Sequence, residues 1–343
     1  MKPLLSIGIP TYNRAALLDL CLSQIFKQIL PHKDLIELIV SDNCSTDNTY
    51  EVVQNYFSKG FQFNYVKNET NKGPDRNILQ AFELAQGKYV LIFSDDDVFF
   101  DGALDILIKI LNGGDYGIIY INGSGFADHF YNRKIEEKKA KAFLYKNKKF
   151  FIYKVNFLFT FISSNVVNKQ LIKDSHIDFQ WFLNTHLVQL SYTYQALLKA
   201  KQNVFVVTPL IAVREDNTGG YNLYRVFGAN LLKIHSYFVE RGNDSKYFSI
   251  IENIQLASFF PYWINKFKTD DSKFINSTAY KELRPLFGKR VFFWLFTFPV
   301  IKLPVFISTI LLVCYRVVKK SWLLLSDFIG IVTGKIQKVK FKF

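Results

Sequence analysis

The sequence predicts an α/β fold with a mainly parallel, doubly wound sheet. Apolar runs of strand length alternate with stretches of helical spacing between residues 4 and 115, and this rhythm is typical of βαβ units. The run YVLIF over 89–93 is apolar at every position, as expected of a strand buried on both faces. Polar clusters follow the strands directly, where open α/β sheets place their ligands.

Local signals set the expected order of elements. The first strand ends at Pro10, and Asn13 can cap a helix that begins at Arg14. Pro74 suits the first turn of a later helix, and Gly87 suits its end. Strands are expected over 4–10, 35–41, 61–66 and 89–94, and helices from 14, 49, 74 and about 101.

After Asp115 the pattern is less regular. Charges are dense and periodic apolar residues are few over 134–149, which predicts a solvated connection. Helical spacing resumes over 181–200. Further strands are expected over 117–121, 161–167 and 204–209, followed by a glycine-bearing loop over 214–220.

Three consecutive carboxylates, Asp95, Asp96 and Asp97, follow the buried strand that begins at Tyr89. Adjacent carboxylates repel one another unless a cation compensates them. Mg²⁺ and Mn²⁺ take hard oxygen ligands and bridge carboxylates to a diphosphate. The triplet therefore predicts a metal site at the sheet edge; the alternative is a solvated acidic turn before the helix near Asp101.

Other polar groups fall at equivalent positions. The segment TYNR over 11–14 and the side chain of Asp42 also follow strands. The carboxyl ends of parallel strands lie side by side, so these groups are expected to meet the acidic triplet at one edge.

Four motifs in order resemble family 2 glycosyltransferases of the GT-A fold, a Rossmann-like fold. They are SIGIPTYNR over 6–14, VSDNCSTDNT over 40–49, NKG over 71–73 with Arg76 and Asn77, and SDDD over 94–97. The resemblance covers roughly the first 120 residues. It implies a nucleotide-sugar donor, transfer with inversion, and Mn²⁺ or Mg²⁺ as cofactor.

By position, the resemblance implies a role for each motif residue. Asp97 and then Asp96 would hold the metal. As alternatives, Thr11 is a turn residue, Asp42 an Asx-turn acceptor and Arg76 a solvated helix charge. The residues expected to bind the donor nucleotide are Pro10, Thr11, Tyr12, Arg14, Asp42, Asn71, Arg76 and Asp95.

Arg214 opens the glycine-bearing loop, and from the residues alone it has two interpretations. The loop could fold over a diphosphate, with Arg214 as its positive charge. Equally, the segment could be a linker between domains.

The catalytic base is the weakest part of the resemblance. The family usually places an Asp at the start of the acceptor-side helix, but the segment over 181–188 contains no acid. His186 stands near that position, and an imidazole can act as a base at neutral pH. Asp178 is the nearest upstream carboxylate. Either residue could instead be structural, with Asp178 as a helix cap.

The end of the chain differs from the rest in composition. Of the formal net charge of +14, ten charges lie in residues 281–343, which hold twelve Lys or Arg and two acidic residues. Between 291 and 318 the chain is nearly all apolar, but Pro299, Lys302 and Pro304 interrupt it. Each uninterrupted piece is shorter than the ~20 residues of a membrane span. Helices lying in an anionic membrane interface are expected; a buried hairpin with a basic tail and one kinked span are the alternatives.

These features predict a donor-binding domain over 1–222 and a helical region over 223–343, with interfacial helices from about 286. The N-terminus shows no signal-peptide pattern. Cys21, Cys44 and Cys314 are too scattered for a zinc site or a disulfide framework. We therefore expect a cytoplasmic protein, bound peripherally to the inner face of the cell membrane.

The leading functional hypothesis is an enzyme that transfers a sugar to a saccharide acceptor, polyprenyl-diphosphate-linked or other, in surface polysaccharide assembly. The alternative is a non-catalytic assembly partner that keeps the nucleotide-sugar fold. Nucleic acid is not expected as a partner, because the basic residues of the tail are interleaved with long apolar runs.

Overall fold

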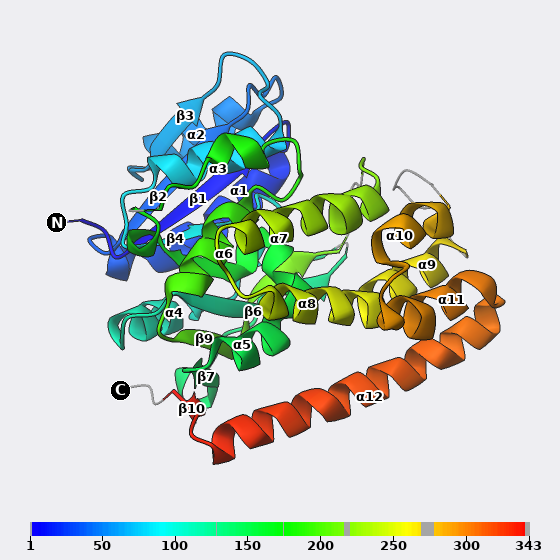
Figure 1. Ribbon diagram of the computed structural model, residues 1–343. Helices are drawn as coiled ribbons and strands as arrows, with labels where there is room; N and C mark the ends of the chain where they lie inside the picture. Colours follow the sequence, from blue (N-terminus) through cyan, green and yellow to red (C-terminus); the bar gives the residue numbers. More distant parts are fainter. Residues whose placement is uncertain (1, 128, 174, 216–219, 269–277, 340–343) are drawn as a thin grey trace. The chain divides into compact units, whose positions relative to one another are not determined.

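The computed structural model describes residues 2–127, 129–173, 175–215, 220–268 and 278–339. The chain divides into two compact units (Figure 1). The first unit comprises 1–146, 159–216 and 337–343, and the second comprises 147–158 and 217–336. The segment 147–158 of the second unit therefore interrupts the first in sequence. The predicted division of the chain at 222 stays a prediction.

The first half of the sheet is parallel, as predicted. β1 pairs with β2 and β4, and β2 pairs with β3, all in parallel. The register sets Thr11 opposite Asp42, so the two strands end together. The elements of this half are β1 (Leu5–Thr11), α1 (Ala15–Ile29), β2 (Ile36–Asp42), α2 (Thr49–Ser58), β3 (Asn64–Lys67), α3 (Pro74–Leu84), β4 (Tyr89–Ile92) and α4 (Ala103–Asn112).

The core of the first unit follows from these periodicities. Leu18, Leu22 and Ile25 recur on one face of α1 and are fully buried, and they join Ile7 of β1 in one apolar cluster. The packing leaves no room for larger residues at some positions. A Cβ on Gly87 would lie 2.7 Å from the backbone nitrogen of Ser6, so glycine allows the chain to pass close to β1 before β4 begins.

The second half of the sheet is mixed, so the α/β prediction is confirmed, whereas the uninterrupted run of parallel strands extends only from β3 to β4. β8 (Asn165–Asn168) lies between β4 and β6 (Ile118–Phe126) and is antiparallel to both. β9 (Asn203–Arg214) is parallel to β6 and antiparallel to β7 (Ala142–Tyr145). The order is β10-β7-β9-β6-β8-β4-β1-β2-β3, with β10 at Ile336–Lys338 and β5 (Val98–Phe99) paired to β9.

Three predicted boundaries were wrong. The supposed connection over 134–149 contains β7, whose Ala142 and Tyr145 are buried although lysines surround them in sequence. The strand expected over 161–167 begins only at Asn165, after a 3₁₀ turn. The helix expected from 181 is α6 (Gln189–Lys199). Asn184 and His186 have φ of 63° and 58°, and this left-handed backbone cannot continue a helix.

The second unit is helical. Apolar residues of several helices and turns form its core, among them Leu256, Leu283 and Phe293. A buried polar group lies within it: His235 Nδ1 is 2.7 Å from Glu252 Oε1, and Arg290 also pairs with Glu252. The helices are α5 (Lys148–Val155), α7 (Leu231–Glu240), α8 (Ser245–Ile254), α9 (Phe260–Phe267), α10 (Ala279–Phe287), α11 (Phe298–Lys302) and α12 (Val305–Val332), with π-helical turns over Arg225–Asn230, Gln255–Phe259 and Phe293–Thr297.

One helix extends the last uninterrupted piece of the apolar stretch over 291–318 well beyond its end. Pro304 forms the N-cap of α12, which then runs for 28 residues. Over the described residues, helices with the length and apolar character needed to span a membrane are absent.

Candidate active site

The ends of β1 and β4 meet in a buried polar cluster. Thr11 Oγ1 donates to Asp95 Oδ2 over 2.7 Å. Arg14 Nη1 lies 3.0 Å from Asp95 Oδ1 and 3.1 Å from Asp96 Oδ2. The cluster therefore brings together groups from the first and fourth sequence motifs, as expected for neighbouring strand ends in a parallel sheet.

A cavity of about 370 Å³ opens beside this cluster. Its size lies within the range of small-molecule sites. Tyr12 is 42% exposed at the cavity, so its ring is accessible to a ligand. The lining residues are Pro10, Thr11, Tyr12, Arg14, Asn43, Asn71, Pro74, Asn77, Ile78, Ser94, Asp95 and Ile162.

The buried carboxylates have perturbed acidities. Burial raises the pKa of Asp95 to about 6, against the opposing effects of Arg14 and Thr11. Burial and the neighbouring charge of Asp96 raise the pKa of Asp97 to about 7. A nearby cation would favour the ionised forms and lower both values.

Asp97 is the second buried carboxylate of the triplet. Its Oδ1 accepts a hydrogen bond from the backbone N–H of Arg214 at 3.1 Å, while its buried Oδ2 makes no hydrogen bond of ordinary geometry in the described part of the chain, although the nearby Ser163 hydroxyl favours the ionised carboxylate and lowers its pKa. The described residues contain no group of three or more His, Cys, Asp or Glu side chains arranged around a metal position. One or two carboxylates suffice when substrate phosphates and water complete an octahedral shell, so the residues present fit such an ion.

Three residues predicted to bind the donor, Asp42, Arg76 and Arg214, lie outside the lining of this cavity. Asp42 is fully buried, and its two oxygens accept bonds from Ser45 N and Tyr65 Oη, each at 2.7 Å. Arg76 Nη1 lies 3.0 Å from Glu83 Oε2. In this arrangement Asp42 stabilises the loop after β2. To accept a hydrogen bond from a nucleotide base, Asp42 would have to give up its bond with Ser45 or Tyr65.

Arg214 meets the acidic triplet through its backbone. Its N–H holds Asp97, whereas its guanidinium donates to the carbonyl of Ala127 at 3.2 Å and lies 5.0 Å from the ring of Phe126. The loop predicted after it falls partly on 216–219, outside the described residues.

A second cavity of about 290 Å³ adjoins the first at Pro74, which lines both. Exposed His186 lines it. The backbone N–H of His186 donates to Asp75 Oδ2 over 2.8 Å, and burial raises the pKa of this carboxyl. The other lining residues are Lys72, Gly73, Asp75, Arg76, Leu183 and Asn184. Exposed Asp178 caps a 3₁₀ turn through Gln180 N and lines neither cavity.

Several residues of the site were missed from sequence. Asn77 donates to the carbonyls of Thr11 and Ser41, tying the ends of β1 and β2 together. The Ser163 hydroxyl accepts from Ser94 N at 2.9 Å. Asn77 stands beside Arg76 in a recognised motif, which could have indicated it, whereas Ser163 lies in the 3₁₀ turn before β8, a strand whose place in the sheet was not predicted.

Comparisons with known proteins identify the family. Residues 6–177 match the model described as Glycosyl transferase family 2. The chain belongs to this family. The predicted family and the glycosyltransferase class are therefore confirmed.

Similarity to individual family 2 enzymes is confined to parts of the chain. An abequosyltransferase of Salmonella typhimurium is 42% identical over 110 residues, 32% of this chain and 33% of that protein. The GalNAc(5)-diNAcBac-PP-undecaprenol beta-1,3-glucosyltransferase of Campylobacter jejuni is 39% identical over 113 residues, 33% of this chain and 36% of that protein. The matched segments thus span about a third of either relative.

Solved structures support the fold. TarS of Staphylococcus aureus, residues 1–349 in complex with UDP-GlcNAc, aligns with a TM-score of 0.58 at 22% identity and covers 77% of this chain and 79% of that one. The same TarS fragment in a second crystal structure covers 94% of this chain and 91% of that one at 20% identity. The predicted GT-A fold is confirmed.

Proposed function

We propose that the chain transfers a sugar from a nucleoside-diphosphate sugar, bound in the cavity beside Asp95, to a saccharide acceptor in surface polysaccharide assembly. The observation that carries this proposal is the joining of Thr11, Arg14 and Asp95 at the cavity, followed in the chain by the buried Asp97. A solvated acidic turn would not need buried carboxylates, one of them with an oxygen that makes no hydrogen bond of ordinary geometry in the described residues.

The donor would be held by both apolar and polar contacts. Pro10, Tyr12 and Ile78 offer surface for a base and ribose, and Asn71 offers an amide. Mg²⁺ or Mn²⁺, held by Asp97 and Asp96, would supply positive charge against the leaving nucleoside diphosphate. Arg14 already neutralises Asp95 and Asp96 in part, which keeps three adjacent acids compatible with a buried site.

The acceptor hydroxyl must lose a proton as the new bond forms. We assign this role to His186, because its side chain is exposed at the cavity that shares Pro74 with the donor cavity. A hydrogen bond to Asp75 fixes the backbone of His186. Asp178 is the less favoured base, since it lines neither cavity. Attack opposite the leaving group would invert the sugar carbon.

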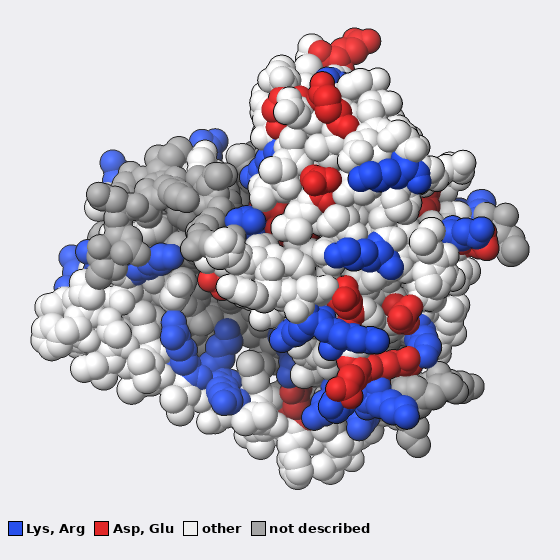
Figure 2. All heavy atoms as spheres, turned by 180° about the vertical axis from the view of Figure 1, so that it is seen from behind, with Lys and Arg blue, Asp and Glu red and all other residues white. Residues whose placement is uncertain are grey.

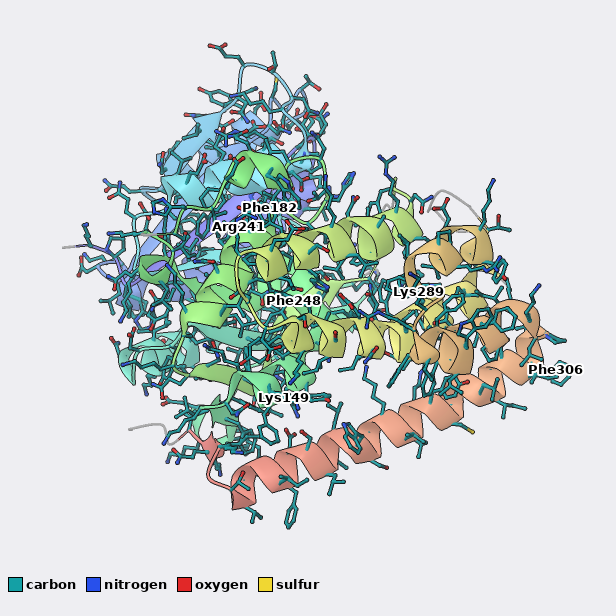
Figure 3. The ribbon with its side chains drawn as sticks, in the orientation of Figure 1. Lys149, Phe182, Arg241, Phe248, Lys289 and Phe306 are labelled. Carbon is teal, nitrogen blue, oxygen red and sulfur yellow. The ribbon has the colours of Figure 1, made fainter. Side chains whose placement is uncertain are left out.

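The second unit supports peripheral attachment to an anionic membrane. Exposed apolar side chains repeat along the outer side of α12, and Phe306 projects outward at its start (Figure 3). Basic residues lie on the same helix, and Figure 2 shows an uncharged area bordered by Lys and Arg on the lobe at lower left. This combination suits the inner face of a cell membrane, where a lipid-linked acceptor would be found. The exposed apolar set on α12 is Phe306, Ile310, Val313, Val317, Val318, Trp322, Leu324, Leu325, Phe328, Ile329, Ile331 and Val332.

The experiment is scanning fluorimetry of the full chain against UDP-, GDP-, CDP- and dTDP-sugars, each with and without Mn²⁺. One nucleotide class is expected to raise the melting temperature, and Mn²⁺ to enlarge the shift. Thr11→Val should reduce it, because the mutation removes the hydroxyl bonded to Asp95. The absence of a shift with every donor, with and without metal, would reject the proposed donor site.

A further inference from the structure

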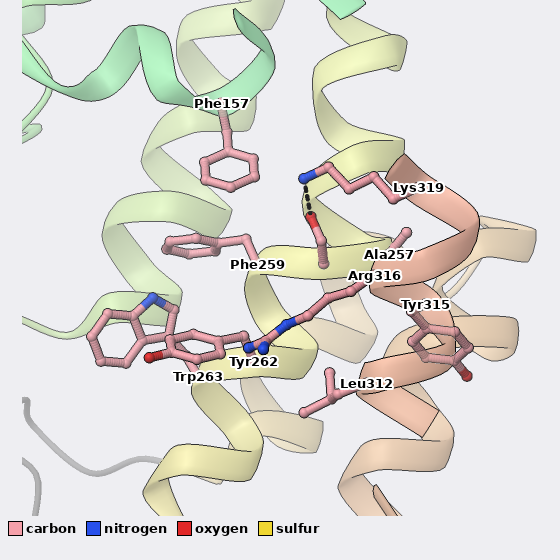
Figure 4. Close-up of a pocket in the computed structure, with 10 residues that line it drawn as sticks. Phe157, Ala257, Phe259, Tyr262, Trp263, Leu312, Tyr315, Arg316 and Lys319 are labelled. Carbon is pink, nitrogen blue, oxygen red and sulfur yellow. Dashed lines mark hydrogen bonds between the residues drawn. The ribbon is translucent and has the colours of Figure 1, made fainter. Parts of the chain in front are cut away.

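A separate cavity of about 350 Å³ lies within the second unit (Figure 4). Its walls are α12 on one side and the turn leading into α9 on the other, with Phe157 at one end. Neither the family motifs nor the donor site includes any of its residues. They are Phe157, Ala257, Ser258, Phe259, Tyr262, Trp263, Leu312, Tyr315, Arg316 and Lys319.

Two cations line this cavity without an acid. The Arg316 guanidinium lies 5.6 Å from the centroid of the Tyr262 ring, and Lys319 Nζ lies 5.5 Å from that of Phe157. Lys319 also donates to Ser258 Oγ over 3.2 Å, as Figure 4 shows. Within the described ranges, neither cation forms an ion pair with a carboxylate.

The position of Lys319 has a cost that an anion would offset. Burial lowers the pKa of its ammonium group, because a charged group loses solvation there. Lys154 of α5, by contrast, has a carboxylate partner: it pairs with Asp327 of α12 at 2.6 Å. The cavity thus presents uncompensated positive charge next to aromatic surface.

We propose that this cavity binds a phosphorylated amphiphile, with the phosphate between Arg316 and Lys319 and the first carbons of the lipid chain against the aromatic rings. Arg and Lys are suited to phosphate oxygens, and aromatic rings provide apolar area for a hydrocarbon. The inference rests on the proposed membrane association and names the cavity as the place where the protein would contact a lipid phosphate. The cavity lies beside Leu312 and Tyr315 on α12, the helix whose outer side is apolar, so a lipid headgroup could enter as the helix settles in the interface.

The test uses the full chain and citronellyl phosphate, a short isoprenoid monophosphate, with inorganic phosphate and citronellol as comparison ligands. Binding is followed by calorimetry. Citronellyl phosphate is expected to bind at least about tenfold more tightly than either comparison ligand, because it alone combines charge with apolar area. Equal affinity for inorganic phosphate would make this a free-phosphate site, and equal affinity for citronellol an apolar cavity; both results would overturn the proposal.

Two neighbouring lysines provide matched variants. Lys319→Ala should weaken citronellyl phosphate binding about tenfold or more, whereas Lys320→Ala, exposed and outside the lining, should change it less than about twofold. Lys319→Arg should retain binding. Ala257→Trp, which fills the cavity but keeps both cations, should abolish it. Equal losses in Lys319→Ala and Lys320→Ala would reject the site.

Liposome sedimentation of the same preparations separates this inference from the proposed function. If the protein sediments with anionic liposomes but does not bind citronellyl phosphate, the cavity assignment fails while membrane association stands. If citronellyl phosphate binds with the expected variant pattern and the protein does not sediment, the site stands and peripheral attachment fails. Melting temperatures of all variants confirm that they fold.

Discussion

The two units of this chain use charge in opposite ways. In the first, Asp95 and Asp97 are almost fully buried, and burial raises the pKa of both. In the second, basic side chains lie near exposed apolar residues on α12. The function of a buried carboxylate depends on the few groups that contact it. The affinity of an interfacial helix for a membrane is instead the sum of small contributions from many residues. Single substitutions should therefore be severe at the donor site of the first unit and mild for membrane attachment through α12.

The largest effect is expected from Asp97→Asn. The change removes a charge at the proposed metal position and should lower metal-dependent donor affinity by about 10³-fold, since an ion there offsets several kcal/mol of charge. Calorimetric titration of the donor with and without Mn²⁺ measures this. Asp34→Asn, an exposed acid elsewhere in the unit, is the control. Donor affinity that is equal in Asp97→Asn and wild type would remove Asp97 from the site.

His186→Ala should slow turnover by about 10²- to 10⁴-fold with donor affinity unchanged, because loss of a general base affects the chemical step alone. Asp178→Ala, which alters the cap of a 3₁₀ turn, should leave the rate within about threefold of wild type. Initial rates under saturating donor distinguish the two. If the effects are reversed, Asp178 is the base.

Asp75→Asn tests whether the site depends on buried neighbours. The carboxylate accepts bonds from the backbone nitrogens of His186 and Val188 at 2.8 and 3.5 Å. Weakening them should reduce turnover about tenfold by loosening the His186 segment, with a smaller effect on donor affinity. A rate unchanged by Asp75→Asn would show that the segment is positioned by other contacts.

In the second unit, membrane attachment should resist single changes. Phe306→Ser alone should reduce liposome partitioning by about tenfold or less, and Phe306→Ser with Phe328→Ser by a larger factor. Both rings are exposed, 68% and 64%, so stability should not fall. Truncation after Phe287 is a poorer test, because it removes buried Phe293 and Val300. Partitioning unaffected by the double variant would exclude α12 as the attached surface.

The smallest effect concerns pH. Burial lowers the pKa of His235. Burial alone would raise the pKa of Glu252, but the hydrogen bonds and charges of His235 and Arg290 outweigh it and lower the pKa of Glu252 overall. Both groups bind protons more readily when unfolded, so the contribution of this pair to stability is greatest near neutral pH, declines below about pH 6.5 and declines further below about 4.5. Hydrogen exchange of α7 and α8 should accelerate accordingly. Glu252→Gln should flatten the lower step, while exposed Glu240→Gln should not.

The sequence was most informative where pattern and motif coincide. Apolar periodicity predicted β1 to β4, and the motif residues Thr11, Arg14 and Asp95 meet as expected because neighbouring strands end together. The antiparallel insertion of β8 could not be predicted, since a short apolar run does not reveal its partners. Asp42 and Arg76 were expected at the cavity but bond elsewhere, and such choices depend on side-chain geometry that spacing does not specify.

The central claim is that the first unit catalyses sugar transfer, and that it is not a non-catalytic domain with the same fold. Release of nucleoside diphosphate from the bound donor, measured with Mn²⁺ and a mixture of lipid-linked saccharides, tests it most directly. The account predicts steady release by the wild-type chain and at least about 10²-fold slower release by both Asp97→Asn and His186→Ala. Donor binding without release above the rate of the Asp97→Asn variant would contradict it and identify the chain as a non-catalytic assembly partner.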